Sequence, residues 1–186
     1  QLRSRCHGNE AIVTSVKETE KKVKAPKLYD LTTLQREANR IYGMTAKQTL
    51  DTAQSLYEKK LITYPRTDSQ YLTEDMEQTA RNVVRQIYEK YQLTGPFDQP
   101  EQPDVKKVMN NSKVTDHHAI IPTMELASSH LDELKSWEEK ILFLIAVHTV
   151  MAMSKDHIYQ ETEIEVECQE EIFKAKGKIV LQDGWK

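Results

Sequence analysis

The feature that most constrains the fold is a change in hydrophobic period along the chain. Residues 160–169, QETEIEVECQ, alternate strictly between glutamates and smaller or apolar side chains. Side chains that alternate in this way lie on opposite faces of a β-strand, so we expect a half-buried strand with an acidic outer face. Residues 10–26 are rich in valine, isoleucine and threonine, and they predict a second strand that ends in a basic linker at Pro26. β-structure is therefore expected at both ends of the chain.

The residues between these strands follow a helical period instead. Residues 34–43, LQREANRIYG, space their apolar side chains for a helix, with Thr33 or the threonine before it as the expected N-cap and Gly43 as the stop. Thr45 stands three residues before Gln48, which is the spacing of a capping box, and predicts a second helix over AKQTLDTAQSLYEKK. The connection between the two helices is only a few residues long, which indicates a helix-turn-helix pair.

Two further helices are expected in the second half of this central region. Thr73 precedes acidic residues that suit the start of a helix, and the helical pattern continues to about Tyr91. Residues 93–104 hold three of the six prolines and predict a loop. Ser136 is the expected N-cap of a long helix, WEEKILFLIAVHTVMAMS, which is apolar on most sides and therefore predicted to be central.

The C-terminal residues return to a period of two. Residues 172–185, IFKAKGKIVLQDGW, predict two more strands that turn at residues 176–177. The whole pattern predicts an α+β fold. In this fold a mainly helical domain of residues 28–157 is inserted into a partial β domain, which residues 1–27 begin and residues 158–186 complete.

Composition limits the possible classes of protein. With 186 residues, of which 38% are hydrophobic and 30% charged, the chain can bury a sizeable core and is expected to be soluble. A membrane span needs ~18 apolar residues, and the best candidate, residues 141–153, is shorter and interrupted by polar side chains. Cys6 and Cys168 are far apart in the sequence and lack the spacing of a zinc site, which indicates a reducing, cytoplasmic location.

Charge and chain ends add two further expectations. The net charge is −3, and no segment forms a convincing basic patch for nucleic acid. The chain begins with Gln1 rather than methionine and ends directly after an apolar run. We therefore expect it to be a piece of a larger protein.

The stretch LITYPRTDS, residues 61–69, carries the first candidate for chemistry. Pro65 disfavours a helical backbone for Tyr64 and holds it on a stiff corner. A tyrosine oxygen can attack a phosphodiester and keep the phosphate as a covalent ester. The planar guanidinium of Arg66 suits a phosphate, and Lys60 adds a second positive charge close to the tyrosine in sequence. Tyr64 is therefore a candidate nucleophile with a cationic clamp beside it.

The stretch TDHHAIIPT, residues 115–123, is the second candidate. Adjacent residues of an extended segment point to opposite faces, so at most one of His117 and His118 should reach a given site. A protonated histidine can bond a phosphate oxygen or transfer a proton. Two adjacent histidines without a further ligand make a poor metal site, so no metal site is predicted in this chain.

Other interpretations stay open on these residues alone. A Tyr-Pro-Arg sequence is commonly only a turn, and the chain could then be a helical nucleic-acid-binding or protein-binding module. A tyrosine recombinase-like enzyme would also use a tyrosine, but it would leave a 3′ phosphotyrosine and need a second arginine with a distant Arg-His pair. Arg81 and Arg85 lie on the next predicted helix, and nothing in the chain repeats that pattern.

Read together, these motifs resemble one family. Residues 56–72, LYEKKLITYPRTDSQYL, resemble the active-site segment of type IA DNA topoisomerases, and DHHAIIPT resembles their second signature. The proline after the tyrosine and the paired histidines are closer to the bacterial topoisomerase III branch than to topoisomerase I. Residues 28–58 match the family's Leu-x-Asp-Leu-x-x-Leu-Gln-x-x-Ala pattern. The resemblance runs from about residue 28 to residue 123, with the two motifs in the family's order.

The resemblance implies a mechanism and a set of partners. Tyr64 would attack single-stranded DNA and hold the 5′ phosphate, another strand would pass through the break, and the break would be resealed without ATP. Arg66 and His117 would bind the scissile phosphate, Lys60 would add a contact to DNA, and His118 receives no role. The Mg²⁺-binding domain precedes this region in the family. We therefore expect the Mg²⁺ ligands to lie in a missing N-terminal domain, and this chain to bind no metal and to be inactive alone.

Overall fold

The computed structural model of the protein describes residues 2–93 and 103–186. The loop expected over residues 93–104 falls almost entirely outside these residues and stays a prediction. Helices and an antiparallel sheet are both present, which confirms the expected α+β class. No helix in the described ranges is both long and apolar enough to cross a membrane.

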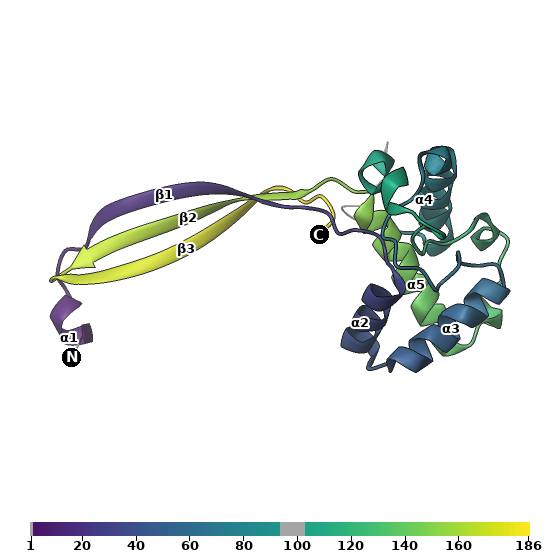
Figure 1. The fold of residues 1–186 in the computed structure, drawn as a ribbon. Coiled ribbons are helices and arrows are strands. Elements are labelled where there is room, and N and C mark those ends of the chain that lie inside the picture. The colour runs from purple at the N-terminus through teal and green to yellow at the C-terminus, as the bar shows by residue number, and fades with distance from the viewer. Residues whose placement is uncertain (1, 94–102) are drawn as a thin grey trace. The chain divides into compact units, whose positions relative to one another are not determined.

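The chain divides into two compact units, each visible in Figure 1. The first, here called the sheet unit, consists of the residues up to Lys24 with Asp156–Gly184 and Lys186. The second, here called the helical unit, consists of Ala25–Lys155 and Trp185. The helical unit thus interrupts the sequence of the sheet unit.

The described residues of the sheet unit form three long strands and one short helix. Helix α1 spans Leu2–Cys6, and the strands are β1 (Ile12–Val23), β2 (His157–Cys168) and β3 (Glu171–Gln182). Both neighbouring pairs are antiparallel, and β2 lies between β1 and β3. The β2–β3 connection is a two-residue turn formed by Gln169 and Glu170. Both residues have positive φ values, 52° and 65°, as tight two-residue hairpin turns require.

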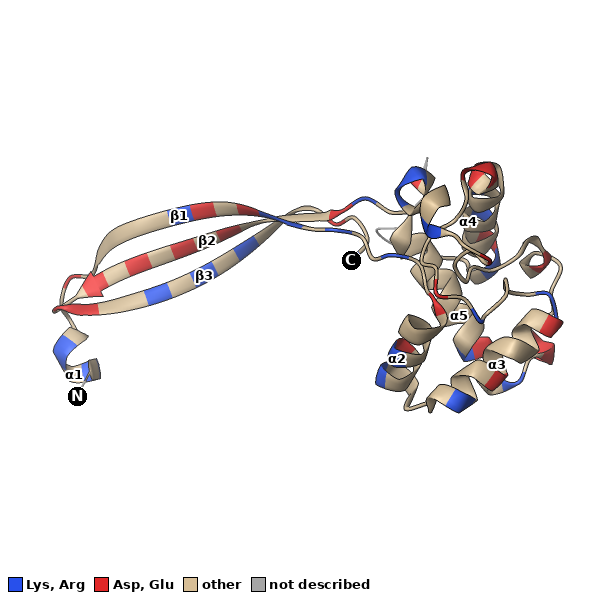
Figure 2. Cartoon of the chain, viewed as in Figure 1, with Lys and Arg blue, Asp and Glu red and all other residues tan. Residues whose placement is uncertain are grey.

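The expected turn at residues 176–177 is wrong, because β3 continues through Gly177 to Gln182. The ladder with β2 runs on through this point, where Gly177 pairs with Thr162, and cross-strand charge pairs add to it. Lys174 and Lys176 form ion pairs with Glu165 and Glu163 of β2, at 2.5 Å for the Lys174 pair. Figure 2 shows these acidic bands of β2 beside the basic bands of β3. Opposite charges directly across an antiparallel pair stabilise the register.

The expectation that β2 buries one of its two faces is also wrong. Both faces of β2 are partly exposed along most of its length, and only its two end residues are buried. The neighbouring strands expose large apolar side chains, among them Ile12 at 60%, Ile172 at 63% and Ile179 at 61%. The alternating sequence specifies a strand, but within the described part of the sheet unit no second layer covers either face.

Within residues 25–93 and 103–155, the helical unit contains four main helices and several short 3-10 turns. The helices are α2 (Leu31–Tyr42), α3 (Ala46–Glu58), α4 (Glu77–Tyr91) and α5 (Ser136–Ala152). The 3-10 turns span Glu74–Met76, Val105–Val108, Asn111–Lys113, Met124–Leu126 and Leu131–Glu133. Helix α5 lies among the others, and nine of its residues are buried, which confirms the central position expected from its sequence.

The helix ends follow local chemistry with two corrections. Thr45 and Gln48 form the expected capping box of α3, and Gly43 ends α2 with φ 68°. The N-cap of α2 is Asp30, whose carboxylate accepts the Thr33 N–H at 2.7 Å, so Thr33 is the partner of the cap rather than the cap itself. A carboxylate also suits the positive end of the helix dipole. Ser136, likewise, is the first residue of α5 and not its N-cap.

Candidate active site

The two sequence motifs lie side by side in the helical unit. Ile62 and Pro122 form an isolated antiparallel bridge. The N–H of Thr63 donates to the carbonyl of Ile121 at 3.0 Å, and the N–H of Thr123 donates to the carbonyl of Leu61 at 3.0 Å. Because Ile62 and Ile121 are each at most 1% exposed, this pairing is part of the core. The Tyr64 corner therefore emerges directly from a rigid strand-like segment.

Side-chain hydroxyls add further links between the motifs. The Thr63 hydroxyl donates to the carbonyl of Ala119 at 3.0 Å and accepts the Ile121 N–H at 3.0 Å. The Thr67 hydroxyl donates to the carbonyl of His117 at 2.9 Å and accepts the Ser69 N–H at 3.1 Å. Threonine thus fixes the backbone before and after the corner, which explains why this residue type flanks Tyr64 on both sides.

The Tyr64 and His117 side chains meet at this junction. Their ring centroids lie 4.3 Å apart at an interplanar angle of 45°. The Tyr64 ring is half-buried, and its other neighbour is the Tyr57 ring of α3, 5.3 Å away in an edge-on arrangement. Two aromatic contacts from separate elements restrict the tyrosine ring while leaving it open to a ligand. A polar ring beside a phenol can hydrogen-bond an anionic group bound between them.

The adjacent histidines differ in the way that alternation predicts. His117 is exposed and contacts the Tyr64 ring. His118 is half-buried, and its Nδ1 lies 2.9 Å from the carbonyl oxygen of Ala119. His118 is therefore occupied by the backbone, whereas the His117 ring faces the corner.

The two expected cations are exposed near the corner. Arg66 has an exposed side chain, and the contacts described here join Tyr64 to His117 rather than to Arg66 or Lys60. Lys60 has φ 62°, and its carbonyl accepts a hydrogen bond from the Thr123 hydroxyl. Its backbone therefore holds the turn from α3 into the Leu61 segment, while the residue as a whole is exposed. Both cations are available to an anion that arrives from solvent.

The buried carboxylate of Glu138, which the sequence did not single out, stabilises the turn at the end of α3. Glu138, at 3% exposure, accepts hydrogen bonds from the Ser55 hydroxyl and the Lys59 ammonium, each at 2.6 Å, and from the Lys135 N–H at 2.9 Å. Burial raises the pKa of Glu138, but these three donors outweigh it and hold the pKa at about 2. The network ties the end of α3 to the start of α5. Only the spacing of Ser55 and Lys59, which lie on one helical face, could have suggested it.

A second feature that the sequence did not indicate is a pair of lysines beside the Tyr71 ring. The ammonium groups of Lys27 and Lys113 lie 5.5 and 5.4 Å from the centroid of this ring. On the Lys113 side, the Ser69 hydroxyl donates a hydrogen bond to the carbonyl of Lys113 at 2.9 Å, which holds that segment close to Tyr71. Two lysine ammonium groups therefore lie beside the ring of Tyr71, seven residues beyond Tyr64.

The residues of this chain do not form a metal centre in the part that the structure describes. No group of three or more His, Cys, Asp or Glu side chains there is placed to hold a metal ion. The acidic residues nearest the corner in sequence, Glu58 and Asp68, are both exposed. What the corner offers to a ligand is a phenol, an imidazole and cationic groups, a set suited to a phosphate ester.

Comparison with known proteins places this corner in a family. A model of the DNA topoisomerase family matches residues 1–186, so the chain belongs to that family. Within it, the chain is similar to the topoisomerase III branch of the type IA enzymes. DNA topoisomerase 3 of Bacillus subtilis (strain 168) is 40% identical over 189 residues, and that of Bacillus licheniformis is 40% identical over 194 residues. These matches and the fold agree with the family expected from the motifs.

The matches also show how much of such a protein this chain represents. Each of those two alignments covers 100% of this chain but 26% of the relative, so the chain spans about a quarter of their length. The structure of full-length topoisomerase I from Thermotoga maritima matches with a TM-score of 0.71 and 27% sequence identity. That match covers 99% of this chain and 30% of the other.

Proposed function

We propose that the protein containing this chain cleaves single-stranded DNA with Tyr64 and rejoins it after another strand has passed. The observation that carries the proposal is the contact between the Tyr64 and His117 rings, 4.3 Å apart on a corner held by the pairing of the two motifs. Membership of the DNA topoisomerase family supports DNA as the substrate. It favours this chemistry over a tyrosine recombinase-like reaction and over a purely binding module.

In the proposed reaction the Tyr64 oxygen attacks a backbone phosphorus. The Tyr64–phosphate bond forms, and the bond from phosphorus to the 3′ oxygen of the neighbouring nucleotide breaks. The product is a 5′-phosphotyrosine and a free 3′ hydroxyl. Rejoining reverses these steps, so the phosphotyrosine conserves the energy of the broken bond and no ATP is needed.

The roles of the neighbouring residues follow from their position and charge. Negative charge spreads over the phosphoryl oxygens in the transition state, and a cation placed there stabilises it. Arg66, exposed two residues beyond the nucleophile, is assigned to the scissile phosphate. His117 is assigned to the same phosphate from the opposite motif, and Lys60 to an adjacent part of the DNA backbone. His118 holds its own backbone instead.

The remaining machinery is assigned to the part of the protein outside this chain. We propose that the Mg²⁺ ligands lie in an N-terminal domain of the whole protein, as the resemblance to type IA topoisomerases implies. This chain then supplies the nucleophile and the phosphate-binding side chains, and the N-terminal domain is its partner in cleavage. We also propose that the whole protein acts on DNA in the cytoplasm.

Adduct trapping tests the proposal directly. The full-length protein is mixed with single-stranded DNA labelled separately at each end, and covalent complexes are stopped with SDS. We expect an adduct on the 5′-phosphate side that is lost in Tyr64→Phe. Tyr57→Phe is the matched control, because Tyr57 touches the Tyr64 ring but is assigned no chemistry. An adduct that survives Tyr64→Phe, or one on the 3′ side, would contradict the proposal.

A further inference from the structure

The only two cysteines of the chain meet at one end of the sheet unit, although they are 162 positions apart. The Cys6 sulfur lies 3.6 Å from the carbonyl oxygen of Cys168, and the Cys168 sulfur lies 3.9 Å from the carbonyl oxygen of Cys6. Both are free thiols. Each sulfur thus lies against the backbone of the other cysteine, so the two side chains are neighbours, and a disulfide between them requires such proximity.

Contacts that do not involve sulfur hold the pair in place. Arg5, the residue before Cys6, donates to the carbonyl of Gln169 at 2.8 Å and forms an ion pair with Glu171 at 2.5 Å. Gln169 begins the β2–β3 turn directly after Cys168. Helix α1 is therefore fastened to the turn by its arginine. The approach of the two thiols is preorganised and does not depend on a bond between them.

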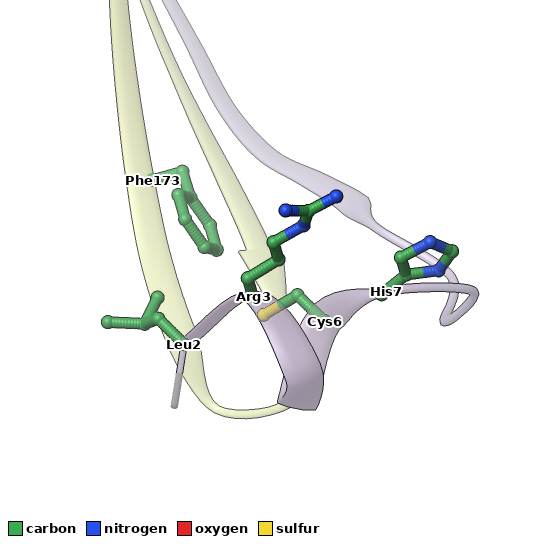
Figure 3. Close-up of a pocket in the computed structure, with 5 residues that line it drawn as sticks. All are labelled: Leu2, Arg3, Cys6, His7 and Phe173. Atoms are coloured by element: carbon green, nitrogen blue, oxygen red, sulfur yellow. The ribbon is translucent and has the colours of Figure 1, made fainter.

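The two thiols differ in access. Cys6 is half-buried and lines an open pocket with Leu2, Arg3, His7 and Phe173, as Figure 3 shows. Cys168 is 5% exposed. Burial, and then the neighbouring Cys6, raises the pKa of the Cys168 thiol. Because Cys6 is the more accessible of the two thiols, a small oxidant from solvent meets Cys6 first.

We propose that Cys6 and Cys168 are a redox modification site that forms an intramolecular disulfide with a low-molecular-weight disulfide as oxidant. The Cys6 thiolate attacks one sulfur of glutathione disulfide, its S–S bond breaks, and one glutathione thiolate leaves. Cys168 then loses its proton to solvent, attacks the Cys6 sulfur of the mixed disulfide and releases the second glutathione. The two protein thiols are oxidised by two electrons, and one glutathione disulfide is reduced to two thiols.

The disulfide ties α1 to the β2–β3 turn. The covalent loop that it closes runs from residue 6 to residue 168 and contains Ala25–Lys155, the continuous part of the helical unit. Such a cross-link restricts the unfolded chain and protects the end of the sheet unit from opening. This inference stands on the geometry of the sheet unit and is independent of the function proposed for Tyr64.

Peptide mapping of the full-length protein tests the proposal. The reduced protein is equilibrated with mixtures of reduced and oxidised glutathione, alkylated, and digested with trypsin without reduction. We expect one cross-linked product that joins the tryptic peptides Cys6–Lys17 and Asp156–Lys174, two hydrogens lighter than the two reduced peptides together. Absence of this product while glutathione accumulates on both cysteines, or cross-links to a different cysteine or molecule, would overturn the proposal.

Variants separate the roles of the two thiols. In Cys168→Ser we expect glutathione to accumulate on Cys6, and in Cys6→Ser we expect Cys168 to stay unmodified under the same conditions. Arg5→Ala should lower the equilibrium constant for closure about two- to fivefold, as expected for loss of one exposed ion pair. Far-UV circular dichroism checks that each variant is folded. Equal reactivity of the two cysteines in the single variants would refute the assigned order of reaction.

Discussion

Replacing Glu138 by glutamine should destabilise the helical unit more than any neighbouring change of the same kind. The carboxylate is 3% exposed and accepts three hydrogen bonds, one of them from the Lys59 ammonium. Its pKa is about 2 in the folded protein against an ordinary value of 4.5, which corresponds to about 3 kcal/mol of stability at neutral pH. Because a glutamine amide keeps one acceptor, we expect Glu138→Gln to cost about 2–3 kcal/mol.

The lowered pKa of Glu138 determines how the effect of Glu138→Gln on stability changes with pH. Folding depresses the pKa of Glu138, so its contribution is complete above the unfolded value of 4.5 and is lost as the pH falls through about 2. The difference in unfolding free energy between wild type and Glu138→Gln should therefore be largest at neutral pH and shrink progressively in acid. Urea unfolding followed by far-UV circular dichroism, repeated over this pH range, measures it.

Glu139→Gln is the matched control, because Glu139 is the next residue of α5 but is exposed. We expect it to change stability by less than about 0.5 kcal/mol at any of these pH values. If Glu138→Gln and Glu139→Gln have the same effect, or if the effect of Glu138→Gln does not decline in acid, the reasoning from the buried network is refuted.

Three further predictions concern the corner, a helix end and the chain as a whole. Thr67→Val leaves the His117 carbonyl and the Ser69 N–H without their partner, so it should cost about 1–3 kcal/mol in urea unfolding and slow adduct formation in the full-length protein; unchanged stability would contradict the assigned hydrogen bonds. Gly43→Ala should lower the free energy of unfolding by about 1–2 kcal/mol, because φ is 68° there. No atom lies close enough to clash with the added methyl group, so backbone strain alone accounts for this loss. Gly177 also lies in open space, but it is in a strand with an ordinary φ, so Gly177→Ala should leave the free energy of unfolding unchanged. Equal losses of stability for the two substitutions would count against backbone strain as the cause. Finally, this chain with Mg²⁺ should not relax supercoiled DNA in a gel assay, and turnover by it would show that the metal-binding part is dispensable.

Most of the local structure was determined by the sequence itself. The Thr45–Gln48 capping box and the stop at Gly43 depend on contacts within a few residues, so the spacing of side chains was enough to predict them. The same holds for the apolar character that places α5 at the centre of the helical unit. The motifs around Tyr64 and His117, likewise, were sufficient to indicate the family. Short-range rules failed at the N-cap of α2, where Asp30 rather than Thr33 is the cap, and at residues 176–177, where strand pairing replaced the expected turn.

The arrangement of the functional groups was decided only by tertiary structure. Tyr64 and His117 meet because a buried bridge joins Ile62 to Pro122, and no local pattern specifies which segments pair. The Glu138 network and the pairing of Cys6 with Cys168 likewise bring together residues from distant parts of the chain. These contacts depend on how apolar faces pack and which strands lie side by side. The physical reason is that burial rewards any well-packed pairing, and only the complete fold selects one of them.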